Sequence, residues 1–265
     1  AELDKPDEAL AAQHKAVELE GTSVWSHLSS TELLMRLGRP REALADLQSA
    51  RRLSPNNFDA VMIEAAALLN LGRSAEALQL INRVIEARPD FRGANLVLGN
   101  ALMANNRPDL ALIAFDKETG INPNDNAVRL ARANALRSLR RTDEALALLD
   151  AAVNDNPADG MALMLRGWTL VDLGRLDQAL AVFDSILRQR GNDPQALFGR
   201  GIVLAAQGKR PEAIGALQRV LDLQPGNRQA QVELAKLRGV APPPPAGRPG
   251  QPPGKRHRAA AKQGQ

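Results

Sequence analysis

The side chains that could do chemistry in this chain are few and widely separated. Its three histidines are His14, His27 and His257, and no spacing among them would place two on one face of a helix to hold a metal. The chain has no cysteine, which excludes disulfides, thiol catalysis and sulfur-ligated metals. No glycine-rich phosphate-binding loop follows a strand pattern. We therefore predict no catalytic site, no metal site and no cofactor, so that this chain by itself is not an enzyme.

One charged pattern is regular enough to suggest a site. Arginine recurs every 34 residues at three consecutive places, and aspartate lies sixteen residues before each one, in the pairs Asp116 and Arg132, Asp150 and Arg166, and Asp184 and Arg200. A row of arginines could hold an acidic peptide. Because the arginine and the aspartate occur only together, however, we predict ion pairs that join one helix to the next.

The elements that must position these pairs repeat with a period of 34 residues. Alanine keeps this spacing seven times, at residues 9, 43, 77, 111, 145, 179 and 213, and a basic residue lies four positions before each alanine. A fixed period of this length indicates stacked supersecondary units. Alanine suits a close helix crossing, glycine ends a helix in a left-handed turn, and proline begins or stops a helix. Each unit is therefore predicted to be a helical hairpin, and the fold is predicted to be all-α.

The residues that recur at this spacing resemble the tetratricopeptide repeat, a 34-residue helix-turn-helix unit with small, large and proline positions in this order. The resemblance implies a right-handed superhelical solenoid. With the recurring alanine at position 20 of each repeat, four segments are expected: the second helix of an incomplete repeat at 1–23, six full repeats at 24–227, a capping helix at 228–238, and a disordered, proline-rich basic tail at 239–265.

The repeat at 92–125 departs most from the family pattern. It has Asn106 for the turn glycine, Leu110 for the usual glutamate, Glu118 for a small residue, and Gly120 late in the second helix. Glycine inside a helix costs about 1 kcal/mol relative to alanine. We therefore predict a locally soft joint across residues 109–121.

A partner-binding groove is the functional site that the resemblance implies. In the family, first helices line the concave face and ligands lie along repeat positions 2, 5, 9 and 12. Position 5 is apolar in every full repeat and position 9 adds two amides and an indole, which predicts a groove formed by Leu28, Met62, Leu96, Asn100, Leu130, Asn134, Met164, Trp168 and Phe198. Such a surface favours an apolar or amphipathic peptide. The alternative is that position 5 is buried between neighbouring first helices.

The carboxy-terminal tail carries the excess positive charge. The net charge of the chain is +4, and the tail contains a basic cluster, Lys255, Arg256, His257 and Arg258. This cluster is predicted to make a weak accessory contact with an anionic surface, the alternative being a merely soluble tail. Since no aromatic side chain lies nearby to stack on bases, no specific nucleic-acid site is predicted. No apolar run is long enough for a transmembrane segment.

The sequence therefore predicts a non-catalytic scaffold that binds a protein or peptide partner. Two alternatives remain: a repeat domain or subunit of a larger enzyme or envelope assembly whose catalytic part lies outside this chain, and a self-assembling scaffold. The unpaired helix at the amino end favours a cut from a longer repeat array over a start that follows a removed signal peptide. The composition fits a soluble protein of the cytoplasm or of the periplasm alike.

Overall fold

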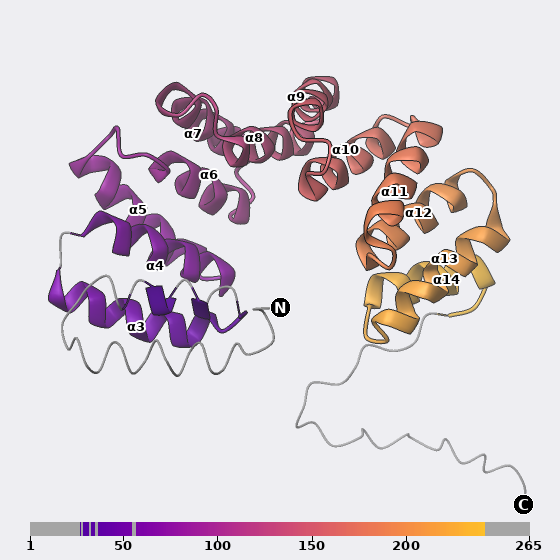
Figure 1. Ribbon diagram of the computed structural model, residues 1–265, viewed down its shortest axis with the longest axis horizontal. Coiled ribbons are helices and arrows are strands. Elements are labelled where there is room, and N and C mark those ends of the chain that lie inside the picture. The colour runs from indigo at the N-terminus through magenta and orange to yellow at the C-terminus, as the bar shows by residue number, and fades with distance from the viewer. Residues whose placement is uncertain (1–26, 28, 32, 35–36, 55–56, 242–265) are drawn as a thin grey trace, which may run out of the picture. The chain divides into compact units, whose positions relative to one another are not determined.

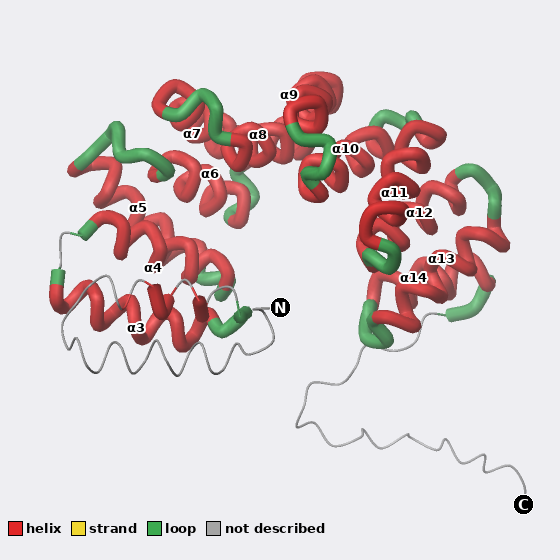
Figure 2. Tube along the Cα trace, viewed as in Figure 1, coloured by secondary structure: helices red, strands yellow, loops and turns green. Residues whose placement is uncertain are grey.

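The structure, a computed structural model, describes residues 27, 29–31, 33–34, 37–54 and 57–241. Every regular element in these ranges is a helix and none is a strand (Figures 1 and 2). Residues 29–31 and 33–34 are helical, and the complete helices that follow are α3 (Pro40–Leu53), α4 (Phe58–Asn70), α5 (Ser74–Ala87), α6 (Ala94–Ala104), α7 (Pro108–Ile121), α8 (Asn126–Ser138), α9 (Thr142–Asp155), α10 (Gly160–Asp172), α11 (Leu176–Arg190), α12 (Pro194–Ala206), α13 (Arg210–Leu223) and α14 (Arg228–Arg238). The prediction of an all-α repeat fold is confirmed. The right-handed superhelical sense stays a prediction, and segments 1–23 and 242–265 lie outside the described residues.

One turn geometry recurs between the two helices of each hairpin. One residue of the turn after the first helix has a positive φ in every repeat from 24–57 onward, at Gly38, Gly72, Asn106, Arg140, Gly174 and Gly208. Glycine adopts this left-handed conformation without strain, and asparagine is several-fold enriched there. The divergent repeat at 92–125 therefore keeps the common turn although it lacks the glycine.

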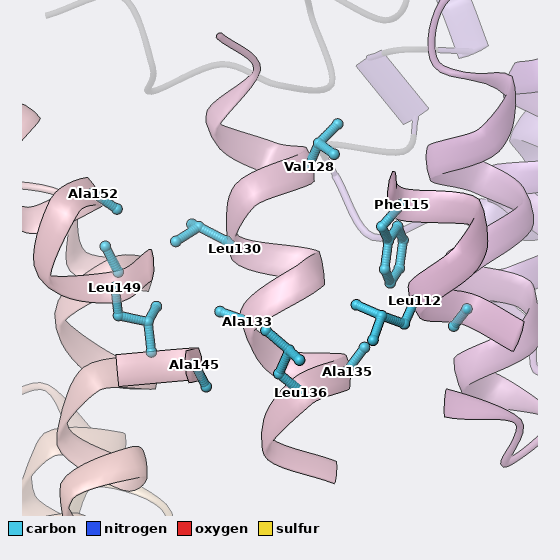
Figure 3. Packing of buried hydrophobic residues seen from close by; sticks show 12 residues of the cluster. Leu112, Phe115, Val128, Leu130, Ala133, Ala135, Leu136, Ala145, Leu149 and Ala152 are labelled. Carbon is cyan, nitrogen blue, oxygen red and sulfur yellow. The ribbon is translucent and has the colours of Figure 1, made fainter. Parts of the chain in front are cut away.

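Alanine and large apolar side chains alternate across the helix crossings. The alanines of the 34-residue column from Ala43 to Ala213 are fully buried. The cluster in Figure 3 shows the arrangement: Phe115 of α7 points toward α8, and Leu149 of α9 approaches α8 from the other side. The small side chains let neighbouring backbones approach while the large ones fill the remaining space. In this cluster the core is therefore a layer between adjacent helices.

The chain divides into two compact units, residues 1–182 and 183–265. In the first unit α4 contacts α6, α6 contacts α8, and α8 contacts α10, so the first helices form one row. The second helices α5, α7 and α9 each pack against the first helices on either side, and α3 packs against α4. No extended contact joins the described second helices α3, α5, α7 and α9 directly. In the second unit α13 packs against α12 and α14.

Of the helices α4, α6, α8, α10, α12 and α14, whose starts the structure describes, all but α6 begin with a side-chain cap. Asn57, Asp125, Asp159, Asp193 and Asn227 each accept a hydrogen bond from a backbone amide in the first turn of the helix that follows. Phe91 occupies the equivalent position before α6, whose N-cap is instead Gly93.

Glu118 of α7 supplies the missing cap from a distance. Its carboxylate accepts hydrogen bonds from the backbone amides of Gly93, at 2.6 Å, and Asn95, at 3.1 Å. The Glu118 side chain is fully buried. The glutamate that departs from the family pattern thus compensates for the phenylalanine that removes the local cap.

Candidate interaction surface

The row of first helices in the first unit carries most of the predicted groove residues. Position 5 is occupied by Met62 on α4, Leu96 on α6, Leu130 on α8 and Met164 on α10. Position 9 lies one helical turn further along the same face, because residues four apart are neighbours on a helix surface. Since these helices contact one another in succession, their equivalent positions form a row across the unit.

The exposure of these side chains differs from helix to helix. Met62, Leu96 and Met164 are partly exposed, whereas Leu130 is 8% exposed and belongs to the buried core cluster. At position 9, Asn100 is exposed, and Asn134 and Trp168 are partly exposed. The face therefore presents apolar surface on α4, α6 and α10, and least of it on α8.

The remaining two groove residues are not part of the row that the structure describes in the first unit. Leu28 lies outside the described residues. Phe198 belongs to the second unit, where it is partly buried on α12 and packs against the cluster that contains Leu217 and Val220. Phe198 therefore occupies repeat position 5 on a first helix of the second unit.

The three predicted ion pairs are confirmed. The nearest guanidinium and carboxylate atoms are 2.6 Å apart in Arg132–Asp116 and in Arg166–Asp150, and 2.8 Å apart in Arg200–Asp184. All six side chains are about one third to one half exposed, so each pair is expected to contribute only about 0 to 1 kcal/mol. Because an aspartate holds each arginine, these arginines do not form a free ladder for an acidic peptide.

One ion pair that the sequence analysis did not predict involves the same repeat position as these arginines. Glu64 occupies the repeat position that carries arginine in the other pairs, and its carboxylate lies 2.7 Å from Arg51 of α3. Here the charges are exchanged, and the arginine precedes the glutamate by 13 residues rather than 16. The available signal was an acid at a repeat position that carries arginine in other repeats. A search at one fixed spacing, however, cannot find a partner that lies at a different repeat position.

The recurring basic residue before each second helix also has a structural role. Arg73 precedes α5 and donates two hydrogen bonds to Glu76, both 2.7 Å long, and Arg141 binds Glu144 in the same way before α9. The hydrogen bond from Arg73 lowers the pKa of Glu76 below its ordinary value of 4.5, and Arg141 lowers the pKa of Glu144 likewise. The charges of Arg73 and Arg141 are therefore balanced at the start of their own second helices.

The described residues contain neither a metal-binding cluster nor a membrane-spanning helix. No group of three or more His, Cys, Asp or Glu side chains in this part of the chain is arranged to hold a metal ion. Within the same ranges, no helix has both the length and the apolar character needed to cross a bilayer.

The helical hairpins, their common turn and their buried alanine column define a helical-repeat protein of the kind that serves as a protein-interaction scaffold. The family model described as tetratricopeptide repeat matches residues 32–92, 64–126, 130–196, 166–228 and 198–237. The chain belongs to the tetratricopeptide repeat family.

Solved structures share this fold at low sequence identity. A tetratricopeptide repeat protein from Parabacteroides merdae is 20% identical with a TM-score of 0.69, over 88% of this chain and 91% of that one. The human IFIT1 dimer with m7Gppp-AAAA is 15% identical with a TM-score of 0.62, over 88% of this chain and 60% of that one. The APC/C hetero-tetramer Cut9-Hcn1 is 20% identical with a TM-score of 0.67, over 89% of this chain and 46% of that one. No curated protein sequence matches the chain.

Proposed function

We propose that this chain is a non-catalytic scaffold that holds an apolar or amphipathic peptide segment of a partner protein on the row of first helices α4, α6, α8 and α10. The observation that carries the proposal is the partial exposure of Met62, Leu96 and Met164 at one repeat position on helices of a single row. Adjoining apolar surface of this kind is typical of a partner site.

The side chains of this face suit a bound peptide. Methionine has an unbranched, polarizable side chain that adapts to irregular apolar surfaces, and Met62 and Met164 supply two of them. Trp168 lies one turn beyond Met164 on the same helix and adds an aromatic surface. Asn100 and Asn134 carry amides that can both donate to and accept from a peptide backbone. The combination favours apolar anchors with a few polar backbone contacts.

An acidic carboxy-terminal peptide fits this face poorly. Family members that grip a terminal carboxylate place lysine at position 5, where the described first-unit residues here are Met62, Leu96, Leu130 and Met164. A carboxylate brought against methionine and leucine would lose water without gaining a cation. The ligand of this face is therefore apolar rather than anionic.

The test compares Met164 of the first-helix row with Ile113 of the second helix α7 under the same substitution. Peptides that bind the intact chain are selected from a random displayed library, and their affinities are measured by fluorescence anisotropy. We expect apolar residues at i, i+3, i+4 and i+7 in the selected peptides, and we expect Met164→Asp to weaken binding at least about tenfold. Ile113→Asp is the control, because Ile113 is 54% exposed and lies on the second helix α7, outside the row of first helices.

Two results would contradict the proposed groove. One is equal binding by Met164→Asp and the intact chain, and the other is equal weakening by Ile113→Asp. Thermal unfolding of both variants checks that they remain folded, and Asn134→Ala tests the same face without placing a charge near the core.

The tail enters the proposal as an accessory element. Its basic cluster, Lys255 to Arg258, lies outside the described residues. Deletion of residues 239–265 is expected to remove any salt-sensitive part of partner binding and to leave the affinity for apolar peptides unchanged, because screening acts on charge contacts. A tail deletion that abolishes binding of the apolar peptides would contradict this division of roles.

A further inference from the structure

A pocket away from the proposed peptide face lies between the helices α3, α4 and α5. Its volume is about 350 Å³, and its wall contains Gln48, Arg51 and Arg52 of α3, Glu64 of α4 and Arg83 of α5, together with aliphatic side chains. The second helices α3 and α5 border it from two sides, and α4 lies between them in the chain and contacts both. It lies wholly within the first unit.

The repeat pattern changes at this junction. In the Arg132 and Arg166 pairs, an aspartate on a second helix meets the arginine of the next first helix. The equivalent residues here are Gln48 and Glu64, so the aspartate is lost and the arginine is replaced by an acid. The paired arginine comes instead from α3, as Arg51. The junction keeps an ion pair but acquires further cations.

The charges around the pocket do not balance. Arg51, Arg52 and Arg83 bring three guanidinium groups to its wall, against the single carboxylate of Glu64. Glu64 lies 2.7 Å from Arg51, and its side chain is 9% exposed, so it is engaged by that arginine. Among the described residues no carboxylate lies within ion-pair distance of Arg52 or Arg83, and both arginines are exposed. Two positive charges are therefore left for a ligand.

A smaller adjoining pocket does not alter this balance. It has a volume of about 180 Å³ and shares Gln48, Arg51 and Glu64 with the first. Its own charged residues are Arg73 and Glu76, which are joined by two hydrogen bonds of 2.7 Å. Their charges cancel, so the excess stays with Arg52 and Arg83.

We propose that the larger pocket binds a small phosphorylated organic molecule, with its phosphate between Arg52 and Arg83. A guanidinium group presents paired N–H donors whose geometry matches a phosphate. Arg51 adds further positive charge, and the Gln48 side chain offers an amide donor. A volume of this size lies in the range of pockets that hold small organic ligands, and exceeds what a bare phosphate needs. The aliphatic wall receives the organic group.

The test uses the full chain and isothermal titration calorimetry at fixed ionic strength. The probes are phenyl phosphate, inorganic phosphate and phenol. We expect phenyl phosphate to bind more tightly than the other two. Arg52→Gln and Arg83→Gln are each expected to weaken its binding at least about tenfold, since each removes charged hydrogen bonds to the phosphate. Both positions are exposed, so neither change disturbs the core.

The matched control is Arg188→Gln, which removes an exposed arginine of α11 outside the pocket. It is expected to change the affinity less than about twofold, because an exposed distant charge acts only through screened electrostatics. An equal loss in Arg188→Gln and Arg52→Gln would overturn the proposal by showing nonspecific attraction. Phenyl phosphate that binds no more tightly than phenol would overturn the phosphate site, and inorganic phosphate that binds as tightly as phenyl phosphate would overturn the organic ligand.

Discussion

Glu118 is a single residue whose role depends on atoms from another helix. An acid at a helix crossing is unfavourable unless it is hydrogen-bonded, and its two partners are the backbone amides of Gly93 and Asn95 at the start of α6. Phe91 stands where the other first helices have their capping side chain. The two departures from the repeat pattern therefore compensate for each other.

Replacing Glu118 should cost more stability than removing an ordinary cap. Glu118→Ala leaves two backbone amides without their partner at a buried site, and we expect the free energy of unfolding to fall by about 2 to 4 kcal/mol. Asp193→Ala is the control, since Asp193 also accepts from two amides but lies at an accessible helix start. Its loss should cost about 1 kcal/mol. Urea unfolding measures both, and equal costs would contradict the proposed role of Glu118.

At the scale of helices, glycines allow aromatic side chains to approach the backbone. Gly99 on α6 faces Phe115 of α7, and Gly199 on α12 faces Phe183. Gly199 and Gly201 are packing glycines, because an added Cβ would lie 2.5 Å from Phe183 at the first and 2.9 Å from Leu217 at the second. Gly120 differs, because an added Cβ there would meet no atom within 4 Å. Its helix end is tied to α6 through Glu118, and the soft joint across 109–121 stays a prediction.

The same substitution at two of these glycines should have opposite effects. A Cβ at position 99 would lie 2.2 Å from the Phe115 ring, so Gly99→Ala is expected to destabilise the fold by about 1 to 3 kcal/mol. Gly120→Ala meets open space and should stabilise it by about 0.5 kcal/mol through helix propensity. Thermal unfolding followed by circular dichroism measures both. A Gly99→Ala variant as stable as the unchanged chain would contradict the close packing described for α6 and α7.

At the scale of the whole molecule, contacts are made between neighbouring helices rather than around one central core. Each buried cluster draws on helices close together in the chain, such as α7, α8 and α9 in Figure 3. In proteins of this kind, stability is approximately a sum of repeat terms and nearest-neighbour terms. Damage to one repeat is therefore expected to act locally.

A core truncation in the second unit tests this expectation. Leu217 is fully buried and packs with Val220 and Leu234, so Leu217→Ala should cost about 2 to 5 kcal/mol. We expect amide exchange to accelerate in α12, α13 and α14 while the amides of α4 to α8 keep their protection. Hydrogen exchange followed by mass spectrometry measures each segment. Uniform acceleration along the chain would show a single cooperative unit instead.

The features determined by the sequence alone are those that recur in register. The hairpin fold, the buried alanines and the three Asp–Arg ion pairs, of which Asp150–Arg166 is one, all follow from the 34-residue period. A period predicts contacts because equivalent residues of successive repeats meet equivalent neighbours. The peptide-binding use of the first-helix row is not of this kind and stays a proposal.

The tertiary structure decided the features that do not follow the 34-residue repeat. Glu118 caps α6, Arg51 pairs with Glu64, and Arg52 and Arg83 are left with unbalanced charge. The residues that interact in these cases occupy repeat positions that share no fixed spacing along the sequence. Leu130 is buried where Met164 is partly exposed, although both occupy position 5. Hydrogen bonding and burial depend on distances between atoms of different helices, and those distances are set by the volumes of all the side chains packed between them.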